Sequence, residues 1–148
     1  MEIVISKLVP LSYNSKNRKN RNEYKKKIRS AFSRKYKGVV PKFPAAEELY
    51  ARVYFFTNCG INVDCDNISK PIWDAVKNLI YDDDCQIILR TATVIDLKIH
   101  PVNIDTSSID GAVAADLMQE LSEKDVKCLY IECGNFKESM IKIGESNI

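Results

Sequence analysis

Histidine is nearly absent from this sequence, and its cysteines show no paired spacing. His100 is the single histidine in the chain. A structural zinc site and a secreted disulfide framework both need closely spaced or evenly paired ligands, so the composition argues against them. We therefore expect reduced thiols, packed as small hydrophobic side chains in a cytoplasmic protein. The five cysteines are odd in number and contain no C-x-x-C pair; they are Cys59, Cys65, Cys85, Cys128 and Cys133.

Long apolar runs are also missing. No stretch approaches the roughly 18 uninterrupted apolar residues that suggest a transmembrane helix. Near the amino terminus, Glu2 and Lys7 interrupt the apolar block that a signal peptide would need. A length of 148 residues suits one domain with its own core, because domains cluster near ~100–150 residues. We expect a single domain over residues 1–148 and no membrane partner.

Positive charge is in excess at the beginning of the chain. Residues 1–42 hold 13 of the 22 lysine and arginine residues, and only Glu2 and Glu23 oppose them. Residues 43–148 hold the other 9 basic residues against 18 acidic ones, although the net charge of the chain is only +2. This asymmetry predicts that residues 1–42 form a segment that contacts a polyanion.

The basic segment contains a predicted strand and a predicted helix. Residues 2–9 have a strand pattern, and residues 15–22 are so polar that we expect a mobile basic loop. Residues 21–36 place apolar side chains three or four positions apart, which predicts a helix with a cationic face. Solvated helices usually mix charges of both signs, so a helix that almost lacks acids favours nucleic-acid contact. The residues expected to bind DNA are Lys16, Arg18, Lys19, Arg21, Lys25, Lys26 and Arg29.

The middle of the chain predicts a strand followed by a helix. Residues 49–57 are aromatic and β-branched, which favours a strand buried on both faces. Residues 61–66 can continue as a short extended segment. A helix should follow, with Asp66 or Asn67 as its N-cap and Pro71 in its first turn, where a missing N–H costs little. Its apolar stripe continues to Ile80, so we expect the helix to end there.

The second half of the chain completes the predicted fold. Residues 85–100 predict one long strand or two short ones, residues 111–123 an amphipathic helix, and residues 127–133 a last strand. Helices and strands do not alternate strictly along the chain. This order favours an α+β domain, with a small mixed sheet and packed helices, over a doubly wound fold.

Two aspartates separated by one residue, Asp64 and Asp66, are the first sign of a chemical site. In an extended segment their side chains would project side by side and repel each other. A divalent cation offsets such repulsion, and carboxylate oxygens suit Mg²⁺ or Mn²⁺ better than zinc. An EF-hand is excluded, because Ser69 stands where its loop needs glycine. A haloacid-dehalogenase-type phosphatase would have its second acidic group farther along, and a nucleotide-sugar transferase would leave the basic segment unexplained.

A longer pattern surrounds this aspartate pair. Residues 64–70 read D-x-D-N-x-x-K, and after a hydrophobic helix residues 83–87 read D-D-x-Q-I. Over residues 63–87, the catalytic motif region, the chain closely resembles the RusA-type Holliday junction resolvases. The basic residues 1–42 are similar to the opening of that family in character only, and the residues from about His100 onward give no match. The resemblance implies a small homodimeric α+β endonuclease, encoded by a bacterium or a phage, that requires Mg²⁺ and cuts four-way DNA junctions symmetrically.

The resemblance also assigns roles to individual residues. It implies that Asp64, Asp66 and Asp84 are metal-binding catalytic carboxylates and that Lys70 is the catalytic lysine. Asp83 is the adjacent acidic residue and the alternative third ligand, because the spacing from the pair fits either position. Asp84 is preferred, since residues 85–87 continue the family pattern directly after it.

Phosphodiester hydrolysis agrees with these residue types. The reaction needs an activated water, stabilisation of charge on phosphorus and a path for the leaving oxygen, and bound metal ions can supply all three. Lys70 in the following helix would add a positive charge near the phosphate, and a helix N-terminus also favours anions. Lys70 has a plainer alternative, a pair with Asp74 one turn away, and Asp82, Asp83 and Asp84 taken alone could be a solvated turn. Asn67 is expected to be a helix cap, Asp82 a bystander and His100 structural.

The sequence therefore predicts a Mg²⁺-dependent, structure-selective endodeoxyribonuclease that resolves four-way junctions in DNA recombination and repair. No small-molecule cofactor is expected. Two alternatives stay open: a nuclease for other branched DNA such as flaps, and a catalytically silent DNA-binding module in which the carboxylates serve only folding.

Overall fold

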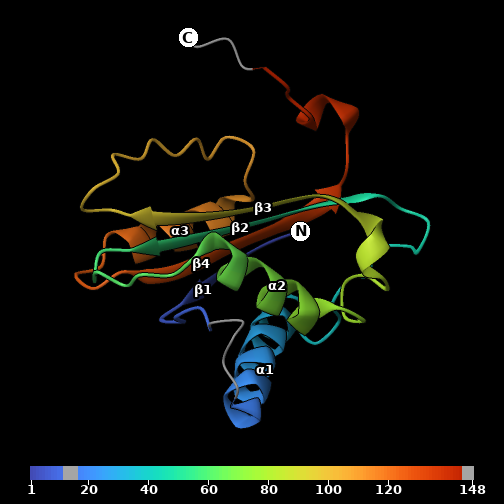
Figure 1. Ribbon diagram of the computed structural model, residues 1–148, viewed down its shortest axis with the longest axis horizontal. Helices are drawn as coiled ribbons and strands as arrows, with labels where there is room; N and C mark the ends of the chain where they lie inside the picture. The colour runs from blue at the N-terminus through green and yellow to red at the C-terminus, as the bar shows by residue number, and fades with distance from the viewer. Residues whose placement is uncertain (12–16, 145–148) are drawn as a thin grey trace.

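The computed structural model describes residues 1–11 and 17–144, and this part contains one four-stranded mixed sheet and three α-helices (Figure 1). β4 pairs antiparallel with β1 and β2, and β2 pairs parallel with β3, which gives the order β1-β4-β2-β3. α2 lies in the crossover that a parallel pair requires. The α+β class is confirmed. The elements are β1 (Glu2–Ser6), α1 (Arg18–Lys35), β2 (Leu49–Thr57), α2 (Cys65–Val76), β3 (Ile87–Asp96), α3 (Gly111–Leu121) and β4 (Lys127–Asn135), with 3-10 turns at Asp84–Gln86 and Glu138–Met140.

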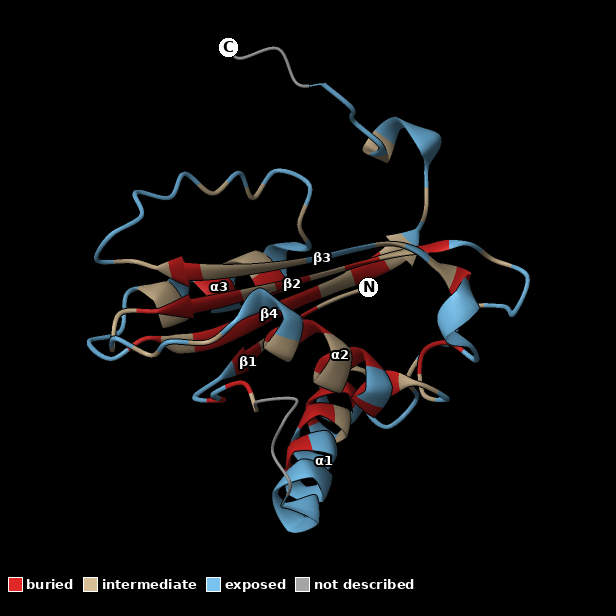
Figure 2. Cartoon of the chain, in the orientation of Figure 1, coloured by how far each residue is buried: buried red, intermediate tan, exposed pale blue. Residues whose placement is uncertain are grey.

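The sheet has an apolar core on each face. α1 and α2 cover one face, and α3 covers the other (Figure 1). Because successive side chains of a strand alternate, β2 contributes Val53 and Phe55 to the core under α1 and α2, and Phe56 to the core under α3. Buried residues follow the sheet and the inner sides of α1 and α2, whereas the outer turns of α1 are exposed (Figure 2). No helix of the described residues is long and apolar enough to cross a membrane.

The prediction that β2 is buried on both faces is wrong for its first half. Ala51 and Val53 are fully buried under α1 and α2, but Tyr50, Arg52 and Tyr54 on the other face are only half-buried. The physical reason is the position of α3, which packs near the end of β2 that carries Phe56 and leaves the other end partly open. One face of β2 is therefore fully buried under α1 and α2, and the other face is fully buried only near Phe56.

The predicted basic loop over residues 15–22 is also wrong for residues 18–22, and residues 15 and 16 lie outside the described ranges. α1 begins at Arg18, because the side chain of Asn17 accepts hydrogen bonds from the N–H groups of Lys19 (3.0 Å) and Asn20 (3.3 Å). A capped helix end exposed to water needs no apolar side chains in its first turns. The predicted apolar face is confirmed by the buried Tyr24 and Ile28.

Both ends of α2 differ from the prediction. The helix begins at Cys65, so only residues up to Asp64 are extended, and it ends at Val76 instead of Ile80. The backbone leaves the helical conformation at Lys77 (ψ 138°) and is left-handed at Asn78 (φ 63°), even though the next apolar residues continue the helical pattern. Ile80 is nevertheless fully buried, because it enters the core from the turn after the helix.

The remaining elements lie close to their predicted positions. Residues 85–100 contain one strand, β3, which ends at Asp96, and its start is preceded by the 3-10 turn. β1 is shorter than the predicted strand over residues 2–9, since Lys7 is left-handed (φ 54°). α3 ends two residues before the predicted boundary at residue 123, and β4 extends to Asn135.

Candidate active site

The first turn of α2 positions the aspartate pair. Asp64 is the N-cap residue with extended backbone angles (φ −77°, ψ 142°), and its carbonyl accepts the N–H of Asn67 at 3.0 Å. The Asp64 side chain makes no hydrogen bond to a backbone N–H of this helix end, and its Oδ2 lies 3.4 Å from the side-chain nitrogen of Asn67. Both aspartates are exposed. The Asp64 carboxylate therefore faces solvent at the helix end.

The predicted side-by-side projection of Asp64 and Asp66 from an extended segment is wrong. Asp66 already belongs to the helix, where residues two positions apart do not share a face. The residue that shares a face with Asp66 is Lys70, four positions later. The structure thus places an acid and the predicted catalytic lysine on one face, while Asp64 occupies the N-cap position without a capping hydrogen bond from its side chain.

A groove of about 410 Å³ separates this part of α2 from the edge strand β3. Asp66 and Lys70 line it from the helix, and Arg90 lines it from β3, whereas Asp64 is not among its lining residues. Lys70 also lies 3.6 Å from Asp74, so the pairing one turn along that the sequence allowed does form. The groove places one carboxylate and two cations around a space open to solvent. Its lining residues are Cys65, Asp66, Asn67, Ser69, Lys70, Arg90 and Ala92.

The second acidic group has three aspartates in three different environments. Asp82 forms an ion pair with Lys42. Asp83 is the N-cap of the 3-10 turn, where its Oδ1 accepts the N–H of Cys85 at 3.1 Å. This hydrogen bond, together with the charge of Lys77, lowers the pKa of Asp83 below its ordinary value. Gln86 completes the cap by accepting the N–H groups of Asp82 (2.8 Å) and Asp83 (3.1 Å).

Asp84 lies at the other end of α2 from Asp66. Its carboxylate is 3.4 Å from Lys77, the residue that ends the helix, and 3.3 Å from the hydroxyl of Tyr81. That hydroxyl donates to the carbonyl of Trp73 at 2.8 Å. Burial raises the pKa of Tyr81, and the negative charge of Asp84 raises it further. The side chain of Asp84 is nevertheless 58% exposed, so its carboxylate oxygens remain accessible to solvent.

The predicted metal ligands fit Mg²⁺ or Mn²⁺ in kind, because all are exposed carboxylates and such hard oxygen donors suit these ions. They are not gathered in one place. Within residues 1–11 and 17–144, no three histidine, cysteine, aspartate or glutamate side chains are grouped so that they could hold a metal ion. Asp66 and Lys77, the partner of Asp84, are separated along α2 by a rise of roughly 16 Å.

The predicted DNA-binding residues are exposed on α1, with two exceptions. Arg18, Lys19, Arg21, Lys25 and Lys26 are exposed along the helix. Lys16 lies outside the described residues. The Arg29 guanidinium is turned inward, donating from Nη1 to the carbonyl oxygens of Ala75 (3.1 Å) and Lys77 (3.3 Å). Arg29 therefore satisfies the carbonyls at the end of α2 and holds α1 against it.

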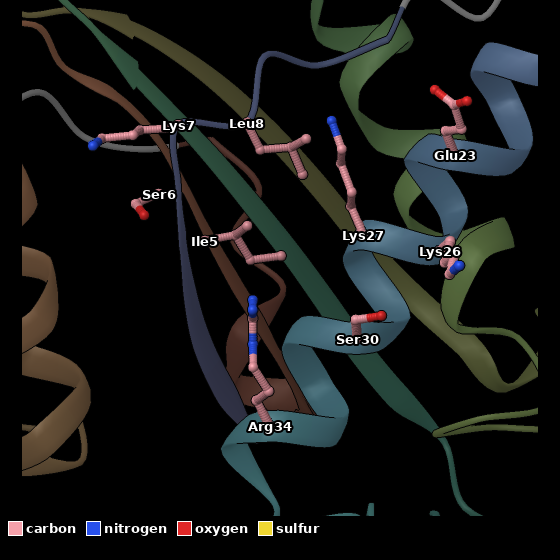
Figure 3. A pocket seen from close by; sticks show the side chains of 9 residues that line it. All are labelled: Ile5, Ser6, Lys7, Leu8, Glu23, Lys26, Lys27, Ser30 and Arg34. Atoms are coloured by element: carbon pink, nitrogen blue, oxygen red, sulfur yellow. The ribbon is translucent and has the colours of Figure 1, made fainter.

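A basic groove of about 440 Å³ lies between α1 and the segment that follows β1 (Figure 3). Lys27 and Arg34 extend from α1 toward this segment, while Lys7 points away from the helix (Figure 3). Glu23 is the single acidic residue in the lining. Sequence reasoning noted the charge of Lys27 and Arg34 but did not assign them to DNA binding. The complete lining is Ile5, Ser6, Lys7, Leu8, Glu23, Lys26, Lys27, Ser30 and Arg34.

Comparison with known proteins gives one family. A search of curated proteins found no match to the chain. The family model described as Endodeoxyribonuclease RusA matches residues 12–104, a range that includes α1, β2, α2, the second acidic group and β3. Because this match covers more than half of the 148 residues, the chain belongs to the RusA endodeoxyribonuclease family.

Proposed function

We propose that this protein is a Mg²⁺-dependent endonuclease that resolves four-way DNA junctions in recombination and repair. The observation that carries the proposal is the groove in which Asp66 and Lys70 face a common space at the start of α2, in a chain of the RusA endodeoxyribonuclease family. The residues would act in a single domain over residues 1–148, in which residues 1–42 contact DNA and residues 63–87 carry the chemistry.

The carboxylates serve the metal in this proposal. Asp64 and Asp66 would hold Mg²⁺, or Mn²⁺ in its place, at the start of α2, and the ion would supply water activation and charge neutralisation at the phosphate. Asp84 lies with Lys77 at the far end of α2, so it would join them as the third ligand only by moving when metal and DNA bind. Asp84 is preferred to Asp83 as the third ligand for a structural reason. The Asp83 carboxylate is occupied in capping the 3-10 turn, whereas among the described residues the Asp84 carboxylate contacts only the side chains of Tyr81 and Lys77 and stays 58% exposed.

The other groups of the site act on the DNA. Water attacks the phosphorus, the bond to the 3′ oxygen breaks and that oxygen gains a proton, which leaves 5′-phosphate and 3′-hydroxyl ends. Lys70 places its positive charge close to the phosphate as negative charge grows on the leaving oxygen. Its pair with Asp74 holds the lysine side chain along the helix on the side of Asp66.

The basic groups of α1 hold the substrate. Arg18, Lys19, Arg21 and Lys25 would contact phosphates along the exposed side of α1, and Lys26, Lys27 and Arg34 would contact them at the basic groove. Such contacts recognise shape and backbone charge and carry no base sequence. A four-way junction has two equivalent strands to cut, so a two-fold symmetric homodimer with two sites would match it.

A cleavage assay on a synthetic mobile four-way junction tests the function. We expect paired nicks at symmetric positions in opposite strands, ligatable ends, and no cleavage when EDTA removes the metal. A flap and a linear duplex of matched length serve as controls. Junction binding without cleavage in Mg²⁺ or Mn²⁺ would identify a silent DNA-binding module, and equal cleavage of the flap would identify a general nuclease for branched DNA.

A further inference from the structure

We propose that Arg90 binds a non-bridging oxygen of the phosphate that is cut. Arg90 lies outside the D-x-D-N-x-x-K and D-D-x-Q-I patterns, and no sequence signal marked it. The inference rests on the proposed nuclease function and adds a substrate-binding residue, supplied by β3, to a site whose other groups come from α2 and the turn after it.

The strand register aims Arg90 at α2. β3 is the edge strand of the sheet, and its residues Arg90 and Ala92 pair with Ala51 and Val53 of β2. Paired residues of neighbouring strands project to the same face of a sheet. Ala51 and Val53 are fully buried beneath α1 and α2, so Arg90 also projects to that face. α2 does not cover this part of the face, so Arg90 is exposed and lines the groove beside the helix.

The groove contains one cation that the protein itself does not neutralise. Lys70 is paired with Asp74 at 3.6 Å. Among residues 1–11 and 17–144 the ion pairs of the structure involve Lys35, Lys42, Arg52, Lys70 and Lys77, and Arg90 is in none of them. Asp66 lines the same groove but is not within ion-pair distance of Arg90. An exposed guanidinium facing a carboxylate across an open groove is arranged for an anion between them.

The chemistry of the two walls selects a phosphodiester. A carboxylate wall alone would repel a phosphate, and the guanidinium of Arg90 on the facing wall offsets that repulsion. Guanidinium has a planar fork of donors that matches two oxygens of one phosphate, which an ammonium group cannot do. Arg90 would therefore orient the phosphate between β3 and α2, with Asp66 and Lys70 on the other side of it.

A binding experiment without metal tests this contact directly. Once the cut position is mapped with the wild type, a junction is made with a neutral methylphosphonate at that position. Affinities of the wild type and of Arg90→Ala for both junctions are measured in EDTA. We expect the neutral linkage to weaken wild-type binding about tenfold and Arg90→Ala binding clearly less, since Arg90 is already gone and only Lys70 remains as a charged partner of this phosphate. Equal losses for both proteins would overturn the inference.

Cleavage of saturated junction in Mg²⁺ gives a second, independent readout. We expect Arg90→Ala to lower the single-turnover rate about 10²-fold, and Arg90→Lys to recover only part of it, because lysine restores the charge without the fork. Lys98→Ala, another exposed cation just beyond β3, is the control and should leave the rate unchanged. A wild-type rate for Arg90→Ala would overturn the inference alone, whereas absence of cleavage by the wild type would overturn the proposed function.

Discussion

α1 and α2 pack on the same face of the sheet with similar apolar side chains but present different charges to solvent. α1 buries Tyr24 and Ile28 and carries nine lysine and arginine residues against one acid, Glu23. α2 buries Ile72 and Trp73, and its exposed side carries acids and bases in turn. A helix surface that carries mostly positive charge attracts a polyanion along its whole length. A surface on which acidic and basic side chains alternate instead creates an electric field that is confined to a small site. We infer that α1 binds the DNA and that the start of α2 cuts it.

Removing the charge of Asp66 tests this division most strongly. Asp66→Asn keeps the size of the side chain but removes a proposed metal ligand, so we expect cleavage of a four-way junction to fall about 10³-fold. Junction affinity should stay close to that of the wild type, because α1 is unchanged. Single-turnover cleavage and gel-shift titration measure the two properties separately. Asp116→Asn on α3, which covers the opposite face of the sheet, is the matched control and should change neither.

The two aspartates of the second acidic group provide the next comparison. We expect Asp84→Asn to lower the cleavage rate about 10²-fold, because it removes a proposed metal ligand. Asp83→Asn should lose less than tenfold, since asparagine can still cap the 3-10 turn. Thermal unfolding of both variants separates loss of the fold from loss of chemistry. A larger defect in Asp83→Asn than in Asp84→Asn, with both folded, would show that the third ligand is Asp83.

The binding region is tested at the basic groove. A double variant, Lys27→Ala with Arg34→Ala, should weaken binding to junctions of any sequence about tenfold near 0.1 M salt. The slope of log affinity against log salt should become shallower by about two, because two phosphate contacts are lost. The cleavage rate of saturated junction should not change. If Lys98→Ala with Lys124→Ala weakens binding as much, the groove has no special part in holding the DNA.

Arg29 gives the smallest effect on DNA and a measurable effect on the fold. Arg29→Ala leaves two carbonyls at the end of α2 without their charged donor, which should lower the free energy of unfolding by about 1–3 kcal/mol. Junction affinity of the folded variant should stay within about twofold. Lys25 is exposed one turn earlier on α1, so Lys25→Ala should weaken junction binding and leave the free energy of unfolding unchanged. Chemical denaturation and gel-shift titration of both variants would contradict this assignment if Arg29→Ala lost affinity and kept its stability.

The parts that could be predicted from the sequence depend on local spacing. The apolar faces of α1 and α2 follow from residues three or four apart, and β2 was predicted at its observed bounds. Pro71 lies within α2 but not in its first turn as predicted, because the helix begins at Cys65 with Asp64 as its N-cap. The start of α1 was missed because its first turns carry no apolar residue and depend on the Asn17 cap. The end of α2 was missed because Ile80 continues the helical pattern although the backbone has already turned at Asn78.

The candidate site was predicted only in part. The motif D-x-D-N-x-x-K identified Asp66 and Lys70, and one turn of helix was enough to place them on one face. Local spacing could not identify Arg90, which lines the opposite side of the groove. Arg90 is twenty residues from Lys70 in the sequence, and only the pairing of β3 with β2 places it across the groove from the helix. Arg29 likewise appeared to be one more cation of a basic helix until its carbonyl partners on α2 were seen.

The sequence by itself determined the residue types of the site, the charge asymmetry of the chain, the α+β class and the family pattern, since each is set by residues close together in the chain. Only the tertiary structure decided which cations bind the protein itself, which line a groove, and that Asp84 lies with Lys77 at the far end of α2. The physical reason is that strand register and helix packing bring distant segments together, and neither is encoded in the spacing of any single motif.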